Sequence, residues 1–282
     1  MNTNDNVKYI AEVVYDFAET FDGATTDDNS NPRNNYLPKG TVDYCDKGIV
    51  YYKQGTSSEQ QYYKLECGRR IYAKSGISKR YEGLLPDHNE LEVKSVARVG
   101  NHTNITLKSL YKAPFKLDLF PQIYTNESPT ARNYTIKEAT YGYVQIIFCY
   151  ATKFKGNIEF TNSDVFSNAE IIPNGNETVV KLYLKKKGAF YGWDSKYDSN
   201  GNLVLSFLEP AKITAADNEY GVSLKGVTIL VDAGHGGEDG GAIALDNSAE
   251  KNYNLDIALR LPLFGGEKDG GIPEHENVPA EK

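Results

Sequence analysis

YYKQGTSSEQQYYKLECGRRIYAKSG, residues 51–76, repeats the triplet Tyr-Tyr-Lys on either side of a polar stretch that contains Gly55 and two serines. Tyrosine is typical of strands, and glycine and serine are typical of turns, so the stretch predicts a strand, a turn and a second strand. The whole chain has 21 tyrosines but a single tryptophan and a single methionine. This composition favours strands over helices well beyond the one hairpin.

The residues before this hairpin leave two interpretations open. Ile10, Val13, Val14, Phe17 and Phe21 follow helical spacing and predict a short amphipathic helix. The same residues are also strand formers, so a first strand is the alternative. Residues 22–35 are polar and rich in turn formers, which predicts a loop.

Residues 1–88 resemble the bacterial SH3-like domains, which are small β-barrels often attached to cell-wall enzymes. The resemblance rests on the turn Leu37-Pro38-Lys39-Gly40-Thr41 and on Tyr63-Lys64-Leu65 followed by Gly68-Arg69-Arg70-Ile71-Tyr72. It implies a β domain preceded by a short N-terminal extension.

Residues 89–213 contain several short runs in which apolar residues alternate with polar ones, a pattern typical of a β-sandwich. Asp198-Ser199-Asn200-Gly201 predicts a hairpin turn, because Asn and Gly tolerate positive φ. The runs include Leu91-Val93-Val96, Ile105-Leu107, Val144 to Phe148, Ile158-Phe160, Val180-Leu182-Leu184 and Leu203-Leu205-Phe207. The region is similar to the β-sandwich modules that precede the catalytic domain in cell-wall amidases, and residues 214–225 then form a linker.

Composition excludes some classes of protein. The net charge is −7 and no long Lys/Arg block occurs, which argues against a nucleic-acid partner because phosphate binding needs a basic surface. No apolar run approaches the ~20 residues that cross a bilayer, so no transmembrane segment is expected. The first residues also lack the basic and apolar regions of a secretory signal.

The three cysteines, Cys45, Cys67 and Cys149, are loosely spaced and do not predict a zinc cluster. Cys45 and Cys67 could meet across a hairpin as a disulfide. The alternative is that all three are small, partly buried side chains.

The stretch from Val227 to Leu261 carries the chemistry. A short apolar run ends in Asp232-Ala233-Gly234-His235-Gly236-Gly237, and an amphipathic helix is expected to begin near Glu250. A dinucleotide-binding loop does not fit, because Asp239 stands where the third glycine is needed. A P-loop does not fit either, since no Gly-Lys-Ser/Thr occurs.

Two interpretations of this loop remain open: a tight turn whose histidine is incidental, or a metal site. In the second, His235 at a strand end and Glu250 at a helix start would offer an imidazole nitrogen and a carboxylate oxygen, both suited to Zn²⁺. Asp232 could accept a hydrogen bond from the other ring nitrogen and fix the tautomer.

The same stretch resembles the opening of the zinc-dependent N-acetylmuramoyl-L-alanine amidases over residues 226–261. The matches are Asp232, Gly234 to Gly237, Asp239, Gly241 to Ile243, Glu250-Lys251 and Asn254-Leu255, and Ala233 replaces the proline of the family. The resemblance implies an α/β domain in which His235 and Glu250 hold zinc, with Asp232 supporting His235. It also implies peptidoglycan as the substrate, and hydrolysis of the amide bond between N-acetylmuramoyl and L-alanine.

Two parts of the family's machinery have no counterpart here. Neither the second zinc-binding histidine nor the catalytic glutamate is recognisable, and His275 does not sit in a ligand motif. No catalytic residue is therefore assigned. Residues 262–282 are rich in Gly and Glu and are expected to be a disordered or aberrant tail, which predicts a truncated or frame-shifted domain that is inactive alone.

The sequence thus predicts a multidomain, mainly β protein, with an SH3-like barrel and a β-sandwich, followed by a truncated α/β amidase segment. The predicted function is peptidoglycan hydrolysis outside the cytoplasmic membrane, in the cell wall or the extracellular space. The alternative is a non-catalytic cell-wall-binding or scaffolding β module.

Overall fold

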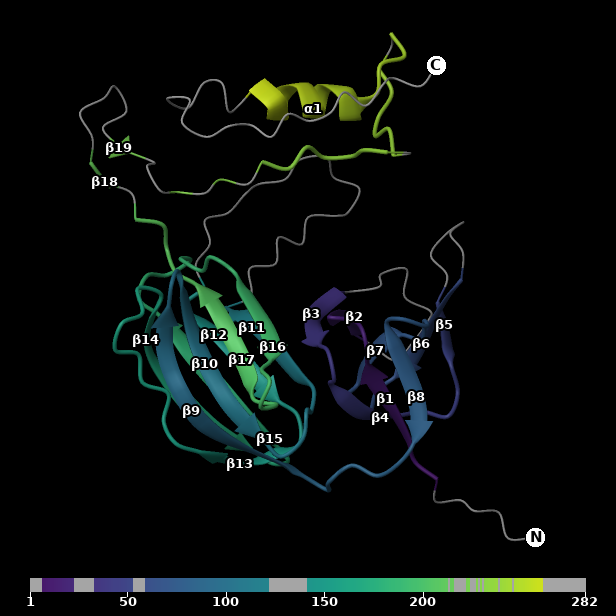
Figure 1. Ribbon diagram of the computed structural model, residues 1–282, viewed down its shortest axis with the longest axis vertical. Helices are drawn as coiled ribbons and strands as arrows, with labels where there is room; N and C mark the ends of the chain where they lie inside the picture. The colour runs from purple at the N-terminus through teal and green to yellow at the C-terminus, as the bar shows by residue number, and fades with distance from the viewer. Residues whose placement is uncertain are drawn as a thin grey trace. The chain divides into compact units, whose positions relative to one another are not determined.

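The structure is a computed structural model, and it describes most of the chain up to residue 260 (Figure 1). The chain divides into two compact units, residues 1–211 and 212–282, which are treated separately below. The described residues are 7–22, 33–52, 59–121, 141–212, 214–215, 222–223, 227, 229, 231–237, 239–244 and 246–260.

The described residues of the first β region of the first unit form eight strands in two sheets. Three strands form one antiparallel sheet in the order β4-β1-β8, and five form the other in the order β3-β2-β7-β6-β5. The strands are β1 (Tyr9–Val13), β2 (Phe17–Asp22), β3 (Arg33–Pro38), β4 (Val42–Cys45), β5 (Val50–Tyr52), β6 (Gln60–Lys64), β7 (Arg69–Tyr72) and β8 (Ser78–Glu82). Their buried faces pack around Ala11, Val13, Ala18, Leu37, Leu65 and Ile71.

The structure decides the open question at the N-terminus in favour of strands. Ile10 and Val13 lie in β1 and are buried, while Phe17 and Phe21 lie in β2. The predicted helix is wrong. The helical spacing arose because β1 and β2 each bury apolar residues against neighbouring strands. The two strands of the predicted hairpin are confirmed, since β5 pairs with β6. The predicted turn between them falls on residues 53–58, which lie outside the described residues. A loop was predicted over 22–35, but β2 extends to Asp22 and β3 begins at Arg33, so both ends of this range lie in strands. Residues 23–32 lie outside the described residues.

In the second β region, the residues that the structure describes form nine strands, and the two sheets share one hydrophobic core. Five strands lie in the order β13-β9-β10-β17-β16 and four in the order β11-β12-β15-β14. The strands are β9 (Asn89–Val99), β10 (His102–Ser109), β11 (Phe115–Phe120), β12 (Tyr143–Phe148), β13 (Ala151–Lys155), β14 (Phe166–Asn174), β15 (Glu177–Leu184), β16 (Trp193–Tyr197) and β17 (Leu203–Leu208). β15 alternates half-buried and buried residues over its whole length, as a strand with one face on a core must.

Two local predictions for this region have different outcomes. The turn at 198–201 joins β16 to β17, and Gly201 takes the positive φ of 79° that it requires. The strand predicted at Ile158–Phe160 is wrong, because these residues are not in a strand. Ile158 is nevertheless buried, and Phe160 packs on the core. The alternation of apolar and polar residues at 158–160 therefore comes from a loop that packs on the core.

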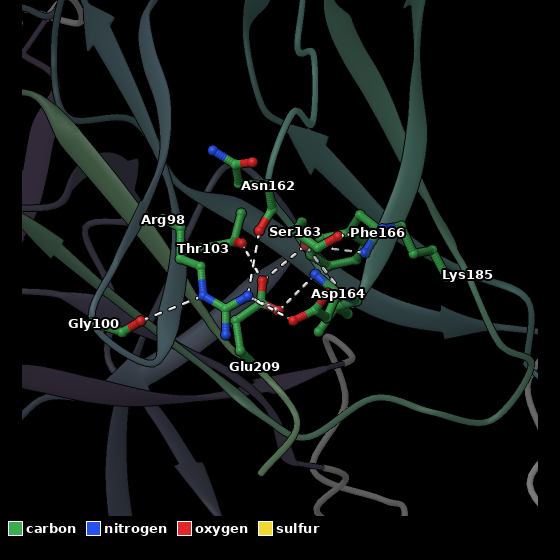
Figure 2. A network of polar contacts seen from close by, with 10 residues as sticks. Arg98, Gly100, Thr103, Asn162, Ser163, Asp164, Phe166, Lys185 and Glu209 are labelled. Atoms are coloured by element: carbon green, nitrogen blue, oxygen red, sulfur yellow. Dashed lines mark hydrogen bonds and ion pairs between the residues drawn. The ribbon is translucent and has the colours of Figure 1, made fainter. Parts of the chain in front are cut away.

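A buried polar network ties the loop before β14 to the ends of β10 and β17 (Figure 2). Glu209, whose side chain is fully buried, accepts hydrogen bonds from Thr103 Oγ1, from Ser163 Oγ at 2.8 Å and from the Asp164 amide at 2.7 Å. Arg98 contacts both Asp164, at 2.6 Å, and Glu209, at 3.6 Å. A buried carboxylate is tolerated where hydrogen bonds and a cation replace its water shell.

The three cysteines are free in this structure, so the disulfide suggested between Cys45 and Cys67 is not formed. Cys149 is buried, whereas Cys45 and Cys67 are half-buried, which agrees with the alternative of small, partly buried side chains.

The two β regions of this unit are joined by buried and partly buried polar contacts. Arg69 donates to the Phe115 carbonyl and, at 3.4 Å, to Asn35 Oδ1. Asn35 in turn donates to the Phe115 carbonyl at 3.2 Å and accepts from the Leu117 amide at 3.1 Å. The Tyr150 hydroxyl donates to Asp43 Oδ1 at 2.9 Å.

The second unit contains two very short strands and one helix among its described residues. β18 (Thr214–Ala215) pairs with β19 (Val222–Ser223) inside the predicted linker, and α1 (Glu250–Arg260) confirms the predicted helix. The described residues 227, 229 and 231 are not in a strand, although a strand was predicted at 227–231. Ile229 is 63% exposed, so it does not lie in the covered strand that its apolar run predicted.

The described residues are thus mainly β with one short helix, which confirms the coarse fold class. The finer identification of the modules as an SH3-like barrel, a β-sandwich and an α/β amidase segment stays a prediction. In the described part of the chain no helix has the length and apolarity needed to cross a membrane.

Candidate functional site

The loop that carries His235 is held in a conformation that ordinary residues avoid. His235 itself has φ of 67°, and Gly236, Gly237 and Gly241 also take positive φ. A non-glycine residue at positive φ is uncommon and is often found at functional positions. Gly236 and Asp239 exchange two backbone hydrogen bonds of 2.9 Å, which fold the chain back on itself after His235.

Helix α1 is fastened to this loop by residues of its first turns. The Glu250 amide donates to the Ala242 carbonyl at 2.9 Å, and the Lys251 amide to the Gly240 carbonyl at 3.2 Å. Two side chains add contacts: Lys251 Nζ donates to the Gly237 carbonyl at 2.8 Å, and Asn254 Nδ2 to the Gly234 carbonyl at 3.0 Å. Glu250, Lys251 and Asn254 therefore place the helix N-terminus beside the histidine loop.

The structure brings His235 and Glu250 together. His235 Nε2 lies 3.4 Å from Glu250 Oε2, which also accepts the Ala242 amide at 2.9 Å. On the other side of the ring, His235 Nδ1 lies 2.9 Å from Asp239 Oδ2. Asp239 is itself fixed, because its Oδ1 accepts the Gly241 amide at 3.0 Å. The imidazole is thus held between two carboxylates.

The hydrogen bond to Asp239 controls the electrostatics of the ring. It raises the pKa of His235 above its ordinary value, and the same contact lowers the pKa of Asp239. The His235 side chain is 34% exposed, so water still reaches it. When neutral, a ring that donates from Nδ1 to Asp239 leaves the Nε2 lone pair directed at the Glu250 side.

The residue that meets Nδ1 differs from the one that the sequence suggested. Asp232 was expected to support His235, but in the structure Asp239 makes this contact. The reason is the chain reversal at Gly236, which returns Asp239 to the ring, whereas Asp232 precedes the loop and is exposed. Asp232 lies instead at a small cavity of about 220 Å³ with Val231, Gly234, Asn254, Ile257 and Ala258.

Gly241 keeps open the space next to His235 and Glu250. A Cβ at this position would lie 2.7 Å from His235 Cδ2, 2.8 Å from Glu250 Cβ and 2.8 Å from Glu250 Oε2. These distances are too short for any side chain, and Gly241 also has φ of 66°. The glycine is therefore needed both for the turn and for the close approach of the two functional side chains.

The imidazole nitrogen of His235 and the carboxylate oxygen of Glu250 are both atoms that bind zinc, but they are only two ligands. Tetrahedral zinc with ligand bonds of roughly 2.0–2.1 Å separates neighbouring ligand atoms by about 3.4 Å. The His235 Nε2 to Glu250 Oε2 distance is 3.4 Å. No group of three or more His, Cys, Asp or Glu that could hold a metal occurs among the described residues. His275 lies outside the described residues.

Asp239 was within reach of sequence reasoning but was not given this role. It belongs to the residues matched to the amidases, and it stands four positions after His235. The signal was missed because contacts across a tight turn depend on its backbone conformation, which glycine spacing alone does not specify.

Comparison with known proteins finds a short match. Over 37 residues, 13% of this chain, the sequence is 60% identical to the protein named "Putative N-acetylmuramoyl-L-alanine amidase" from Buchnera aphidicola (subsp. Acyrthosiphon pisum, strain APS). The match spans 16% of that protein's length. No family model matches the chain, and no solved structure matches it.

Proposed function

We propose that residues 226–261 are the opening of a zinc-dependent amidase domain, and that the protein hydrolyses the amide bond between N-acetylmuramoyl and L-alanine in peptidoglycan. The observation that carries the proposal is the 3.4 Å approach of His235 Nε2 to Glu250 Oε2 in a motif that resembles this family. The 60% identity to an amidase-named protein over 37 residues supports it. The protein would act in the cell wall or outside the cell.

In this proposal His235 and Glu250 hold the metal, and Asp239 orients His235. A bound zinc ion would polarise the amide carbonyl and lower the pKa of a water molecule. His235 keeps Nε2 available because Nδ1 is engaged by Asp239, and Gly241 keeps the space beside both ligands open. A third protein ligand and a general base are not assigned to any described residue. The supporting role that the sequence analysis gave to Asp232 passes in this proposal to Asp239, which contacts His235 Nδ1.

The β regions are proposed to hold the substrate. The SH3-like and β-sandwich assignments imply modules that bind peptidoglycan next to the catalytic segment. We infer no separate scaffolding function, because the features specific to a known activity lie in residues 226–261.

The test is zinc binding, followed by calorimetry on the chain and on the variants His235→Ala and Glu250→Gln. One zinc per chain is expected, and each variant should weaken binding by about tenfold or more. Asp256→Asn is the matched control, because this helix carboxylate pairs with Arg260 and not with His235. Zinc binding that survives both variants unchanged would contradict the site.

A second measurement addresses the reaction. Purified peptidoglycan is incubated with the zinc-loaded chain, and soluble products are identified by mass spectrometry. Release of stem peptides that begin with L-alanine supports hydrolysis by this chain. Because the sequence predicts that the chain is inactive alone, zinc binding without such release is the expected result for this chain.

A further inference from the structure

Three aromatic side chains form an exposed cluster on the first β region. Tyr15 lies in the connection between β1 and β2, Phe17 begins β2, and Tyr36 lies on the neighbouring strand β3. Their exposed fractions are 53%, 48% and 48%. The Phe17 ring packs against both tyrosines, with centroid distances of 5.9 Å to Tyr15 and 4.9 Å to Tyr36. We call this continuous surface the aromatic platform.

The exposure of these rings contrasts with the aromatic packing elsewhere in the same sheet. Phe21, at the other end of β2, and Tyr62 on β6 are each 1% exposed and pack against each other. The first β region therefore has a buried place for aromatic rings, and the platform lies outside it. A group of large apolar side chains that stays on the surface usually marks a binding site.

The platform is held in one arrangement before any ligand arrives. The Lys39 amide donates to the Asp16 carbonyl at 3.0 Å, and Phe17 is paired with Pro38 across β2 and β3. The Phe17 ring meets both tyrosines edge to face, at interplanar angles of 64° and 66°, which is a favourable geometry for aromatic pairs. A ligand would thus meet rings that are already ordered, so binding loses little side-chain entropy.

The charged groups beside the platform compensate each other. The Asp16 and Lys39 side chains are 81% and 64% exposed, and Lys39 Nζ lies 3.8 Å from Asp16 Oδ1. As a pair they are neutral, which favours an uncharged ligand over a polyanion or a strongly basic peptide. They still offer a carboxylate that accepts hydrogen bonds and an ammonium group that donates them. A purely apolar ligand would remove water from both groups and return no hydrogen bond.

We propose that the aromatic platform binds an uncharged glycan strand, with sugar rings stacked on the exposed aromatic rings and sugar hydroxyls bonded to Asp16 and Lys39. A pyranose ring has a face of C–H groups and an edge of hydroxyls, which matches an aromatic surface bordered by polar groups. The ring spacings of 5.9 and 4.9 Å are also close to the length of one unit in a β-1,4-linked chain, so neighbouring sugars can meet neighbouring rings.

The choice of N-acetylated wall sugars as the glycan rests on the proposed function, whereas the preference for a sugar strand rests on the platform alone. The probe is therefore the N-acetylglucosamine tetramer, which is uncharged and contains no peptide. It is titrated into the isotope-labelled full chain in the presence of a metal chelator, and amide NMR spectra are recorded. We expect saturable shifts at the amides of Tyr15, Phe17 and Tyr36.

Variants separate stacking from simple apolar contact. Phe17→Leu keeps an apolar side chain but removes the ring, and it should weaken binding of the tetramer by about tenfold or more. Phe17→Tyr keeps the ring and should bind as the wild type does. Tyr36→Ala tests the same surface from β3, so the result does not depend on one variant folding. Tyr51→Ala is the matched control, because Tyr51 is 46% exposed on β5, at the opposite edge of the described sheet.

Several results would overturn the proposal. These are no shift at millimolar tetramer, shifts confined to other parts of the chain, wild-type affinity in both Phe17→Leu and Tyr36→Ala, or an equal loss in Tyr51→Ala. Shifts at the platform with a peptide-only wall fragment but not with the tetramer would show a peptide site instead. The outcome is independent of the amidase test, because binding of the tetramer in chelator requires neither zinc nor hydrolysis.

Discussion

Gly241 shows how a single residue without a side chain can determine a site. Its missing Cβ is what allows His235 and Glu250 to approach each other, as the distances of 2.7 and 2.8 Å to a built Cβ show. Neither functional side chain could keep its position beside a larger residue. The glycine therefore belongs to the metal-site hypothesis as much as the two ligands do.

We predict that Gly241→Ala separates His235 from Glu250 and weakens zinc binding by about tenfold or more, measured by calorimetry. Gly237→Ala is the matched control, since Gly237 is in the same loop and has φ of 54° but has open space around it. Both variants carry the backbone strain, and only one carries the clash. Equal losses in the two variants would show that strain, not access, explains the effect.

Asp43 is a residue whose charge state depends on the junction between the β regions. Burial raises the pKa of this carboxyl well above its ordinary value, and it is 1% exposed. A pKa raised in the folded state means that the protonated form is favoured by folding. Its contribution to stability is fully present below the unfolded pKa of about 4 and is lost as pH rises through the folded pKa.

We predict that the free energy of unfolding falls less between acidic and neutral pH in the Asp43→Asn variant than in the wild type. The amide oxygen can still accept the Cys67 amide, and the amide nitrogen can donate to the Tyr150 hydroxyl once that hydroxyl rotates. Urea unfolding at a series of pH values measures the effect. Asp46→Asn, at a carboxyl that is 62% exposed, is the control, and a wild-type pH profile in the Asp43 variant would refute the assignment.

At the scale of elements, the loop before β14 depends on one carboxylate at the end of β17. Ser163 Oγ donates to Glu209 and accepts the Val165 and Phe166 amides at 3.2 and 3.1 Å. Glu209 thus holds Ser163 in place, and Ser163 in turn holds the backbone up to Phe166, the first residue of β14. Removing the carboxylate leaves several donors without their acceptor.

Glu209→Ala is predicted to lower the free energy of unfolding by about 3 kcal/mol, because buried donors lose a charged acceptor. Denaturant unfolding measures the loss. Hydrogen exchange should show faster exchange at the amides of Asp164, Val165 and Phe166. Glu159→Ala, at an exposed glutamate, should change neither quantity, and unchanged exchange in the Glu209 variant would contradict the role of the network.

Sequence patterns predicted elements where the cause is local. The β5–β6 hairpin, the turn at 198–201 and helix α1 all follow from residues within one or two turns of chain. The pattern misled at Ile10–Phe21 and at Ile158–Phe160, where burial is decided by elements far away in the sequence. The site shows the same division, since the pairing of His235 and Glu250 was expected but the role of Asp239 required the turn geometry.

At the scale of the molecule, the two β regions are joined by polar groups that no sequence pattern connects. Arg69 and Asn35 in the first region meet the backbone of β11 in the second. From the sequence alone, each of these polar side chains would be expected to lie on the exposed face of its own strand. Their burial follows from the junction, which explains why the sequence alone suggested two independent domains.

The last prediction tests whether this junction makes the unit fold cooperatively. Arg69→Met keeps the length of the side chain but removes the hydrogen bonds to Phe115 and Asn35, and it should cost about 3 kcal/mol. With the junction weakened, the single unfolding transition should split into two, because each β region has its own core. Urea unfolding followed by tyrosine fluorescence and by circular dichroism distinguishes the cases.

Arg80→Met, whose partners Asp46 and Lys47 lie within the first region, should keep one transition. Coincident transitions in the Arg69 variant would show that the two regions are coupled by apolar packing rather than by the buried arginine.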